Sequence, residues 1–211
     1  MDIKALRNEY KKGELKDESV HPDPIRQFEI WFEQALHADL TDVNAMTLAT
    51  VSKSGKPSTR TVLLKEFNDK GFVFYTNYES RKGTELIENP NASLLFFWKE
   101  LERQIRIEGK AVKTSPGESD NYFDLRDMES RISAIISPQS QVIPSRHYLE
   151  DRWLECLKEV EHSGIKRPAF WGGFRVIPDS IEFWQGRPNR LHDRIKYILK
   201  NGGWERIRLA P

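Results

Sequence analysis

Four clusters of basic residues stand beside predicted strands, and their side chains could together bind an anionic ligand. The clusters are Arg60–Lys65, Ser80–Lys82, Glu102–Arg106 and Arg190–Arg194. Arginine offers a planar fork that grips phosphate with two hydrogen bonds, whereas lysine acts as a compact point charge. Each charge-assisted bond is worth roughly 1.5–3 kcal/mol, so a bound phosphate needs several donors. Taken singly, each cluster could instead be a solvated strand end paired with nearby acids.

Trp184 differs from the other aromatic residues because it directly precedes the loop Gln185–Pro188, which leads into the Arg190–Arg194 cluster. An aromatic ring beside several cations is a suitable platform for a flat, anionic ligand. Within the cluster, Arg190 and His192 are two residues apart and would point to the same side of an extended segment. Most other aromatic residues near strands are expected to pack in the core.

The common motifs for nucleotides, nucleophiles and metals are missing from the sequence. No G-x-G-x-x-G follows a predicted strand, and neither a P-loop nor a G-x-S-x-G elbow occurs. The five histidines lack the spacing of a metal site, so no bound metal is expected. A phosphate-bearing ligand must therefore be held by side chains and strand backbone.

Charge and composition narrow the possible partners. The 211 residues include 33 basic and 32 acidic side chains, and the net charge of +1 gives no overall field for nucleic acid or an anionic membrane. No run of about 18 apolar residues occurs, and Met1–Lys12 lacks an apolar signal core. The single cysteine, Cys156, suits a reducing compartment and lies in a helical pattern. We expect a cytoplasmic protein without nucleic-acid or membrane partners, in which Cys156 has a packing role.

The elements that must position the basic clusters are mostly strands. Residues 1–20 are highly charged and are expected to form a mobile segment ahead of a single domain, residues 21–211. Asp23 can cap a helix whose first residue is Pro24 and whose aromatic residues follow at helical spacing. Five strands are then predicted, at 45–52, 58–65, 72–76, 92–98 and 104–112. A short helix at 81–88 is predicted between the third and the fourth of these strands.

The second half of the chain adds helices and then returns to strands. Helical patterns occupy 118–125, 130–136 and 146–160, and strands follow at 173–176, 180–185, 193–198 and 204–208. Many short strands with few helices between them argue against a doubly wound α/β sheet. We predict a mainly β protein with flanking helices, built as a closed or split β-barrel.

The last basic cluster also carries a family resemblance. The segment Ile181–Gln185 (IEFWQ), four variable residues and Arg190–Arg194 (RLHDR) resemble the closing motif of the pyridoxamine 5'-phosphate oxidases. Further blocks resemble the family in the family's order: RTVLLK at 60–65, VFYTN at 73–77, SRK at 80–82, LERQ at 101–104, FWGGFR at 170–175 and RLAP at 208–211. The resemblance covers about residue 5 to the C-terminus.

This resemblance implies an FMN-binding split β-barrel that works as a homodimer with FMN at the subunit interface. By position, the implied FMN contacts are Arg60, Thr61, Val62, Leu63, Leu64, Lys65, Tyr75, Thr76, Arg81, Lys82, Gln104, Gln139, Ser140, Trp184 and Arg194. The implied substrate contacts are Lys65, Tyr122, Arg126 and Ser130 for a phosphate, Arg190 and His192 over a pyridine ring, and Arg7 and Tyr10 in a segment that covers the site. Arg190 and His192 are the implied catalytic residues.

The implied reaction is the FMN-dependent oxidation of pyridoxamine 5'-phosphate and pyridoxine 5'-phosphate to pyridoxal 5'-phosphate, with oxygen as acceptor and hydrogen peroxide as product. Arg190 would pin the pyridine ring, and His192 would orient the reacting 4' group or help its proton leave. Tyr122, Arg126 and Ser130 recur every four residues, so they share one helix face if a single helix continues through them.

One departure and two alternatives remain. Ile132–Ile135 reads Ile-Ser-Ala-Ile where relatives often carry Ile-Gly-Ala-Trp, which could alter the loop before Gln139. The chain could be another flavin or deazaflavin oxidoreductase on the same barrel, although such a protein would lose the substrate-phosphate set. It could also be a non-catalytic protein that binds FMN or a B6 phosphate, although the presence of Arg190 and His192 argues against this.

Overall fold

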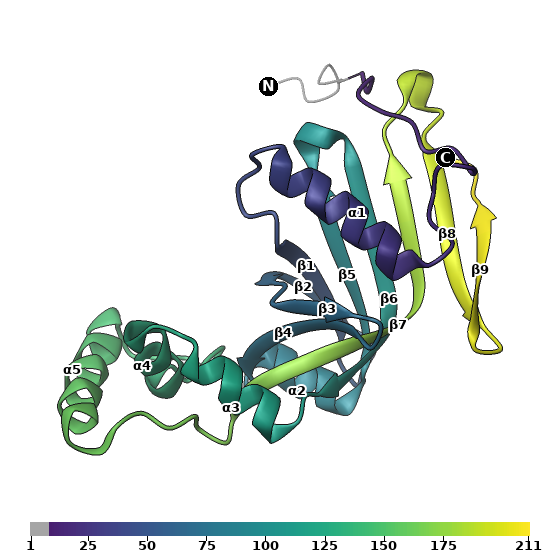
Figure 1. Ribbon diagram of the computed structural model, residues 1–211. Coiled ribbons are helices and arrows are strands. Elements are labelled where there is room, and N and C mark those ends of the chain that lie inside the picture. The colour runs from purple at the N-terminus through teal and green to yellow at the C-terminus, as the bar shows by residue number, and fades with distance from the viewer. Residues whose placement is uncertain (1–8) are drawn as a thin grey trace.

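Nine antiparallel strands form one strongly curved sheet in the computed structural model, which describes residues 9–211 apart from the side chains of 161–163 (Figure 1). The sheet order is β2-β1-β5-β6-β7-β4-β3, and β8 and β9 continue from β7. The strands are β1 (Ala45–Val51), β2 (Pro57–Leu63), β3 (Glu66–Asn68), β4 (Gly71–Asn77), β5 (Asn91–Trp98), β6 (Arg103–Lys113), β7 (Trp171–Gln185), β8 (Asp193–Lys200) and β9 (Gly203–Arg208).

Strand β7 joins the two halves of this sheet. Its first part, residues 171–176, pairs with β4, and its last part, residues 180–185, pairs with β8. Strand β6 follows β7 along its length and shifts register between Glu108 and Gly109. Figure 1 shows that β7 is bent along its course. Such a bulge bends a strand and increases its twist. A Cβ on Gly109 would lie 2.0 Å from the Ile177 carbonyl oxygen, so this close approach requires glycine. The sheet is therefore a barrel that is split around β7.

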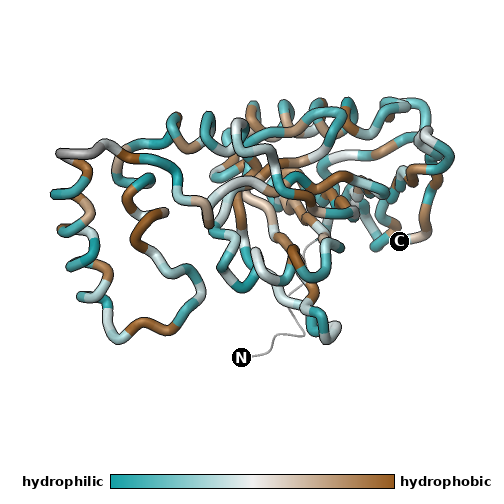
Figure 2. Tube along the Cα trace, turned by 90° about the horizontal axis from the view of Figure 1, so that it is seen from below, coloured by the Kyte–Doolittle hydropathy of each residue, from teal (hydrophilic) through white to brown (hydrophobic). Residues whose placement is uncertain are grey.

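The inner face of the curved sheet forms the main hydrophobic core, which helix α1 (Pro24–His37) covers. Phe28 of this helix is fully buried, and its ring centroid lies 4.8–5.2 Å from those of Phe67, Phe72 and Phe96. The predicted cap is confirmed, since the Asp23 side chain accepts a hydrogen bond at the helix start. Figure 2 shows hydrophobic segments gathered inside the barrel and hydrophilic turns around it.

In the described part of the chain, four further α-helices lie outside the barrel: α2 (Arg81–Glu88), α3 (Pro116–Asp124), α4 (Met128–Ile136) and α5 (Arg146–Ser163). Helices α4 and α5 project away from the sheet (Figure 1) and enclose a small separate cluster around Ile132, Ile136 and Cys156. The predicted packing role of Cys156 is thus confirmed, since the residue is only 8% exposed. Across the described residues, no helix combines the length and apolar character of a bilayer-spanning segment.

Residues 9–20 lie against the sheet instead of standing apart from it. The backbone N–H groups of Lys11 and Lys12 donate to the Glu102 carboxylate at 2.7 and 2.9 Å. The Leu15 N–H donates to Asp193 at 3.0 Å. The sequence predicted a mobile segment over residues 1–20 from its charge alone. Mobility of this segment stays a prediction, and these hydrogen bonds show where residues 11–15 contact the barrel.

Most predicted elements are confirmed to within two residues, and α2 begins and ends where the sequence predicted. The strands predicted at 173–176 and 180–185 are one strand, β7, because the bulge bends the chain without ending its pairing with β6. The sequence missed β3, which at three residues is too short to show alternation. The predicted fold class, a mainly β split barrel with flanking helices, is confirmed.

Candidate active site

A cavity of about 720 Å³ opens between the barrel and the helices α3 and α4. Its lining comes from β2, β4, the start of β7, the first turn of α2 and the two helices. It unites residues predicted for the cofactor with residues predicted for the substrate phosphate. The cofactor set contributes Thr61, Val62, Leu63, Lys65, Tyr75, Thr76, Lys82 and Gln139, and the phosphate set contributes Lys65, Tyr122, Arg126 and Ser130.

Lys82 is a buried cation in this lining. It is 9% exposed, and its ammonium group donates to Thr76 Oγ1 at 3.1 Å and to Gln139 Oε1 at 2.9 Å. Within the described chain it forms no ion pair with an acid. Burial, together with the nearby charge of Arg60, lowers the pKa of Lys82 to about 8. Because a buried charge without a counterion is unfavourable, this lysine would gain from an incoming anion.

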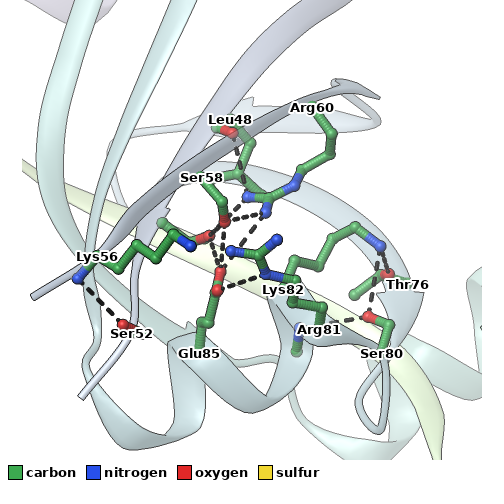
Figure 3. A network of polar contacts seen from close by, with 12 residues as sticks. Leu48, Ser52, Lys56, Ser58, Arg60, Thr76, Ser80, Arg81, Lys82 and Glu85 are labelled. Carbon is green, nitrogen blue, oxygen red and sulfur yellow. Dashed lines mark hydrogen bonds and ion pairs between the residues drawn. The ribbon is translucent and has the colours of Figure 1, made fainter. Parts of the chain in front are cut away.

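Two arginines beside Lys82 share one buried acid (Figure 3). Arg60 of β2 and Arg81 of α2 both contact the carboxylate of Glu85, which is 5% exposed. Arg81 Nε lies 2.9 Å from Oε1, and Arg60 Nη2 lies 3.5 Å from Oε2. Neither arginine lines the cavity itself, but both stand next to Lys82, so three cations gather at this end.

Aromatic rings and an unpaired arginine form another part of the lining. Tyr75 and Tyr122 stack with 3.9 Å between ring centroids, and Trp171 lies 5.6 Å from Tyr75. The Arg126 guanidinium carbon lies 4.8 Å from the Trp171 ring centroid. Its Nη1 is buried and has no hydrogen-bond partner among the residues that the structure describes. Leaving a buried charged donor unpaired is costly, so this atom calls for an acceptor from a ligand.

Two helices and the turn between them place the side chains of Tyr122, Arg126 and Ser130 at the cavity. Helix α3 ends before Arg126, and Asp127 caps the separate helix α4 by accepting from the Ser130 N–H. The condition for a shared helix face, one helix running through all three residues, is therefore not met, and the two separately predicted helices at 118–125 and 130–136 are confirmed. All three side chains still line the cavity, because the turn between α3 and α4 lies at its edge.

A second group of predicted residues lies at the other end of β7. Gln104 of β6, Trp184 of β7 and Arg194 of β8 are register partners, so they form one row on the same face of the sheet. Glu182, two residues before Trp184, is 3% exposed and accepts from Arg194 at 2.8 Å and from Arg106 at 2.6 Å. Arg194 is therefore already paired with an acid.

Tyr10 and His192 pack on Trp184. The His192 ring centroid lies 4.7 Å from that of Trp184, and Tyr10 meets Trp184 edge-on at 5.6 Å. His192 Nδ1 accepts the backbone N–H of Arg187 at 3.1 Å, which places the proton of the neutral ring on Nε2. Burial and the charge of Arg190 lower the pKa of His192 and so favour that neutral form. His192 therefore offers an N–H donor suited to orienting a polar group.

Arg190 is exposed and does not lie on an extended segment. It closes the short 3-10 turn Pro188–Arg190 with φ +62°, and β8 begins only at Asp193. The assumption that Arg190 and His192 point to one side of a strand is therefore wrong. Left-handed backbone at non-glycine residues is uncommon and clusters at ligand-binding and catalytic loops.

Trp171 and Trp184 mark the two groups at opposite ends of one strand. Thirteen residue steps separate them, which amounts to roughly 40 Å of strand at about 3.3 Å per residue. Figure 1 shows one end of β7 beside α3 and the other end beside β8. The predicted FMN contacts are thus divided between two places that do not meet within one chain.

A few predicted residues fall outside both groups. Leu64 is 5% exposed and belongs to the barrel core, because β2 ends just before it and its side chain turns inward. Ser140 lies in an exposed turn with φ +72°. Arg7 lies outside the described residues.

The sequence reasoning missed three residues that shape these groups. Trp171 stacks against Arg126, while Glu85 and Glu182 are the buried acids that hold arginines in place. The four-residue spacing of Arg81 and Glu85 on a predicted helix could have identified Glu85 as a partner of Arg81. Nothing in the sequence alone marks Glu182 as buried and paired.

A curved antiparallel sheet divided around one long strand, with a cation-lined cavity at its edge, defines a split β-barrel protein. Two family models cover most of the chain: the pyridoxamine 5'-phosphate oxidase model matches residues 32–157, and the pyridoxine 5'-phosphate oxidase C-terminal dimerisation region matches residues 171–211. The chain belongs to the pyridoxine/pyridoxamine 5'-phosphate oxidase family of enzymes.

Curated relatives and solved structures agree with this assignment. The pyridoxine/pyridoxamine 5'-phosphate oxidase of Rubrobacter xylanophilus is 53% identical over 100% of this chain and 97% of its own length. That of Paraburkholderia phymatum is 56% identical over 98% and 97%. Among solved structures, PhzG from Burkholderia lata, in complex with tetrahydrophenazine-1-carboxylic acid, is 31% identical with a TM-score of 0.88 over 93% of this chain and 98% of its own.

Proposed function

We propose that this protein uses FMN to oxidise pyridoxamine 5'-phosphate and pyridoxine 5'-phosphate to pyridoxal 5'-phosphate, with oxygen as the electron acceptor and hydrogen peroxide as the product. The observation that carries this proposal is one cavity lined by both Lys82 and Arg126, two cations without acidic partners in the described chain. A cofactor phosphate and a substrate phosphate would each neutralise one of them.

The end of the cavity at Lys82 fits the phosphate of FMN. Lys82 donates there only to uncharged oxygens, those of Thr76, Ser80 and Gln139, and Arg60 and Arg81 add two further positive charges beside it. A buried lysine in the lining with two arginines beside it suits a phosphate dianion better than a neutral ligand. We assign the remaining cofactor contacts in the cavity to Thr61, Val62, Leu63, Lys65, Tyr75, Thr76 and Gln139.

The Arg126 end of the same cavity fits the phosphate of the substrate. Trp171 supports the guanidinium from one side, and the buried Nη1 lacks an acceptor among the described residues. Lys65, Tyr122 and Ser130 line the cavity as well and supply a second cation and two hydroxyl groups. This orphaned donor favours a phosphorylated substrate over its unphosphorylated form, because only the phosphate satisfies it.

The chain supplies position and electrostatics for the reaction. When bound, FMN supplies the acceptor for a hydride from the 4' carbon of the substrate, and oxygen later takes up the electrons. His192 would donate its Nε2–H to the reacting 4' group and orient it, since its Nδ1 is occupied by the Arg187 N–H. Arg190 would place its charge over the pyridine ring and stabilise the developing anion. Tyr10 packs on Trp184 and His192, where it would exclude water.

We propose that two copies of the chain complete each site. The family's dimerisation region, residues 171–211, contains Trp184, Arg190, His192 and Arg194. In a two-fold dimer, this group from one copy would face the cavity of the other, which gives two equivalent sites. Such sharing explains why the predicted FMN contacts occupy both ends of β7. The single, buried Cys156 suits the reducing cytoplasm, where we place the enzyme.

Absorbance spectroscopy tests cofactor and substrate together. The purified protein should be yellow, should release FMN on denaturation and should bleach when pyridoxamine 5'-phosphate is added without oxygen. Retention of FMN with no bleaching would favour a binding protein, and bleaching only by a nicotinamide donor would favour a flavin reductase. A colourless protein that does not bind added FMN would overturn the proposal.

A further inference from the structure

Glu85 is the most completely bonded carboxylate near the cavity (Figure 3). Its Oε2 accepts from the hydroxyl groups of Thr50 and Ser58 and lies 3.5 Å from Arg60 Nη2, while its Oε1 accepts from Arg81 Nε at 2.9 Å. The side chain reaches from α2 to β1 and β2, so it connects three elements. Burial acts to raise the pKa of Glu85, but hydrogen bonds from Thr50, Ser58 and Arg81 outweigh it and lower the pKa to about 2.

The guanidinium of Arg60 fixes the direction of its own hydrogen bonds in this network, whereas the 3.2 Å contact between Thr50 Oγ1 and Ser58 Oγ can have either hydroxyl as donor. Arg60 donates to Thr50 Oγ1 and to Ser58 Oγ, both at 2.6 Å, and a guanidinium cannot accept. Each hydroxyl therefore accepts from Arg60 and can give its single proton to Glu85. The carboxylate thus orients both hydroxyls, and the hydroxyls hold the guanidinium of Arg60.

We propose that Glu85 is a positioning residue that fixes Arg60 and Arg81 at the phosphate end of the flavin site. This inference rests on the proposed use of FMN. The carboxylate itself would repel a phosphate, and its oxygens are already occupied, so it acts through the two arginines. Arg60, Arg81 and Lys82 carry three positive charges and Glu85 carries one negative charge, so two positive charges remain. This matches a phosphate group with a charge of about −1.5 to −2 at pH 7.

A glutamine at position 85 should separate the two arginines. Its amide oxygen can take the place of Oε2 and keep the hydroxyls and Arg60 in position. Its amide nitrogen would then face Arg81 Nε, and two donors cannot bond to each other. Glu85→Gln should therefore release Arg81 alone, whereas Glu85→Ala should release both arginines.

The experiment compares FMN with riboflavin, which lacks the phosphate, as ligands of the flavin-free full-length protein. Quenching of flavin fluorescence gives each Kd. We expect Glu85→Gln to raise the Kd for FMN about tenfold and Glu85→Ala about 100-fold, the range expected for losing one and two charge-assisted contacts. The Kd for riboflavin should stay within about twofold of the wild type. Glu150→Gln, which removes a similar but exposed pair with Arg146 on α5, should change neither value.

The outcomes separate the inference from the proposed function. If the Glu85 variants weaken FMN and riboflavin equally, or weaken neither, the positioning role is wrong, because Glu85 then supports only the fold of α2. Glu85→Gln has the shape of the native side chain, so its result decides the matter even if Glu85→Ala does not fold. If the wild type binds neither flavin, the proposed FMN function itself fails.

Discussion

The cavity beside α3 and α4 differs from the group at the other end of β7 in whether its cations are paired with acids. We call the latter the Trp184 group, which comprises Tyr10, Gln104, Trp184, Arg187, Arg190, His192 and Arg194. In the cavity, Lys82 and Arg126 form no ion pair with an acid of the described chain. In the Trp184 group, Arg194 is bonded to the buried Glu182 at 2.8 Å, and Arg187 lies 3.5 Å from Asp193. Unpaired buried cations have most to gain from an anion, whereas paired ones contribute shape and orientation. We therefore expect the cavity to dominate phosphate binding and the Trp184 group to act on rings and reacting atoms.

Replacing Lys82 should have the largest effect on the cofactor. Lys82→Met keeps most of the side-chain volume but removes the buried charge, so we expect the Kd for FMN to rise about 100-fold or more, as for loss of a charged bond in a buried site. Flavin-fluorescence titration of the flavin-free protein measures this. The exposed Lys110 on β6 is the matched control. A similar rise in the Kd for FMN in Lys110→Met would show that the overall charge of the protein, and not the cavity, attracts FMN.

Removing Arg126 should act on the substrate and leave the cofactor in place. Arg126→Ala should raise the KM for pyridoxamine 5'-phosphate by roughly 30- to 100-fold, because the substrate phosphate loses a charged, buried donor. FMN content and the KM for unphosphorylated pyridoxamine should stay near their wild-type values. Steady-state kinetics with both amines provide the test. An equal change for the two substrates would remove Arg126 from the phosphate site.

The affinity for FMN should fall as the pH rises through about 8. The pKa of Lys82 is lowered to about 8, so its charge is present at pH 7 and lost above that value in the flavin-free protein. Bound phosphate would raise this pKa again, so FMN binding takes up a proton, and we expect the Kd to rise roughly tenfold from pH 7 to pH 9. Riboflavin binding should not change over this range. A flat FMN profile would place Lys82 away from the phosphate.

Arg194 should contribute least to cofactor affinity, in line with its pairing. Glu182 already neutralises its charge, so Arg194→Ala should raise the Kd for FMN only about threefold. Arg106 remains bonded to Glu182 at 2.6 Å and keeps that buried acid paired in the variant. The same titration measures this effect. If Arg194→Ala raised the Kd for FMN as much as Lys82→Met, the proposed difference between the two regions would be wrong.

The sequence predicted the parts of this molecule that depend on local pattern. The limits of α2, the Asp23 cap and most strands follow from turn residues and alternation, and these are confirmed. It could not predict that β7 is continuous, because the pairing with β6 that carries the strand past its bend is a long-range property. It did separate α3 from α4, as helices at 118–125 and 130–136, but it did not identify Asp127 as the cap of the second helix.

The candidate site was predictable as a set of residues and not as an arrangement. The family resemblance assigns Lys65, Tyr122, Arg126 and Ser130 by position, and these residues all line one cavity. The distance between this cavity and Trp184 follows only from the fold. A sequence motif also cannot predict the role of a buried acid such as Glu85, because its hydrogen-bond partners come from three separate elements.

Mixing two impaired variants, at a substrate concentration far below the KM of Arg126→Ala, tests most directly the claim that two chains share each site. Arg126→Ala damages the cavity, and Arg190→Met damages the group at the other end of β7. If sites are shared, a mixed dimer contains one intact site, so dissociating and reassociating equal amounts should restore about a quarter of the wild-type activity. The parent variants, treated in the same way but unmixed, should stay at their own low activity at that substrate concentration. Formation of mixed dimers without any recovered activity would contradict the account, because each site would then lie within one chain.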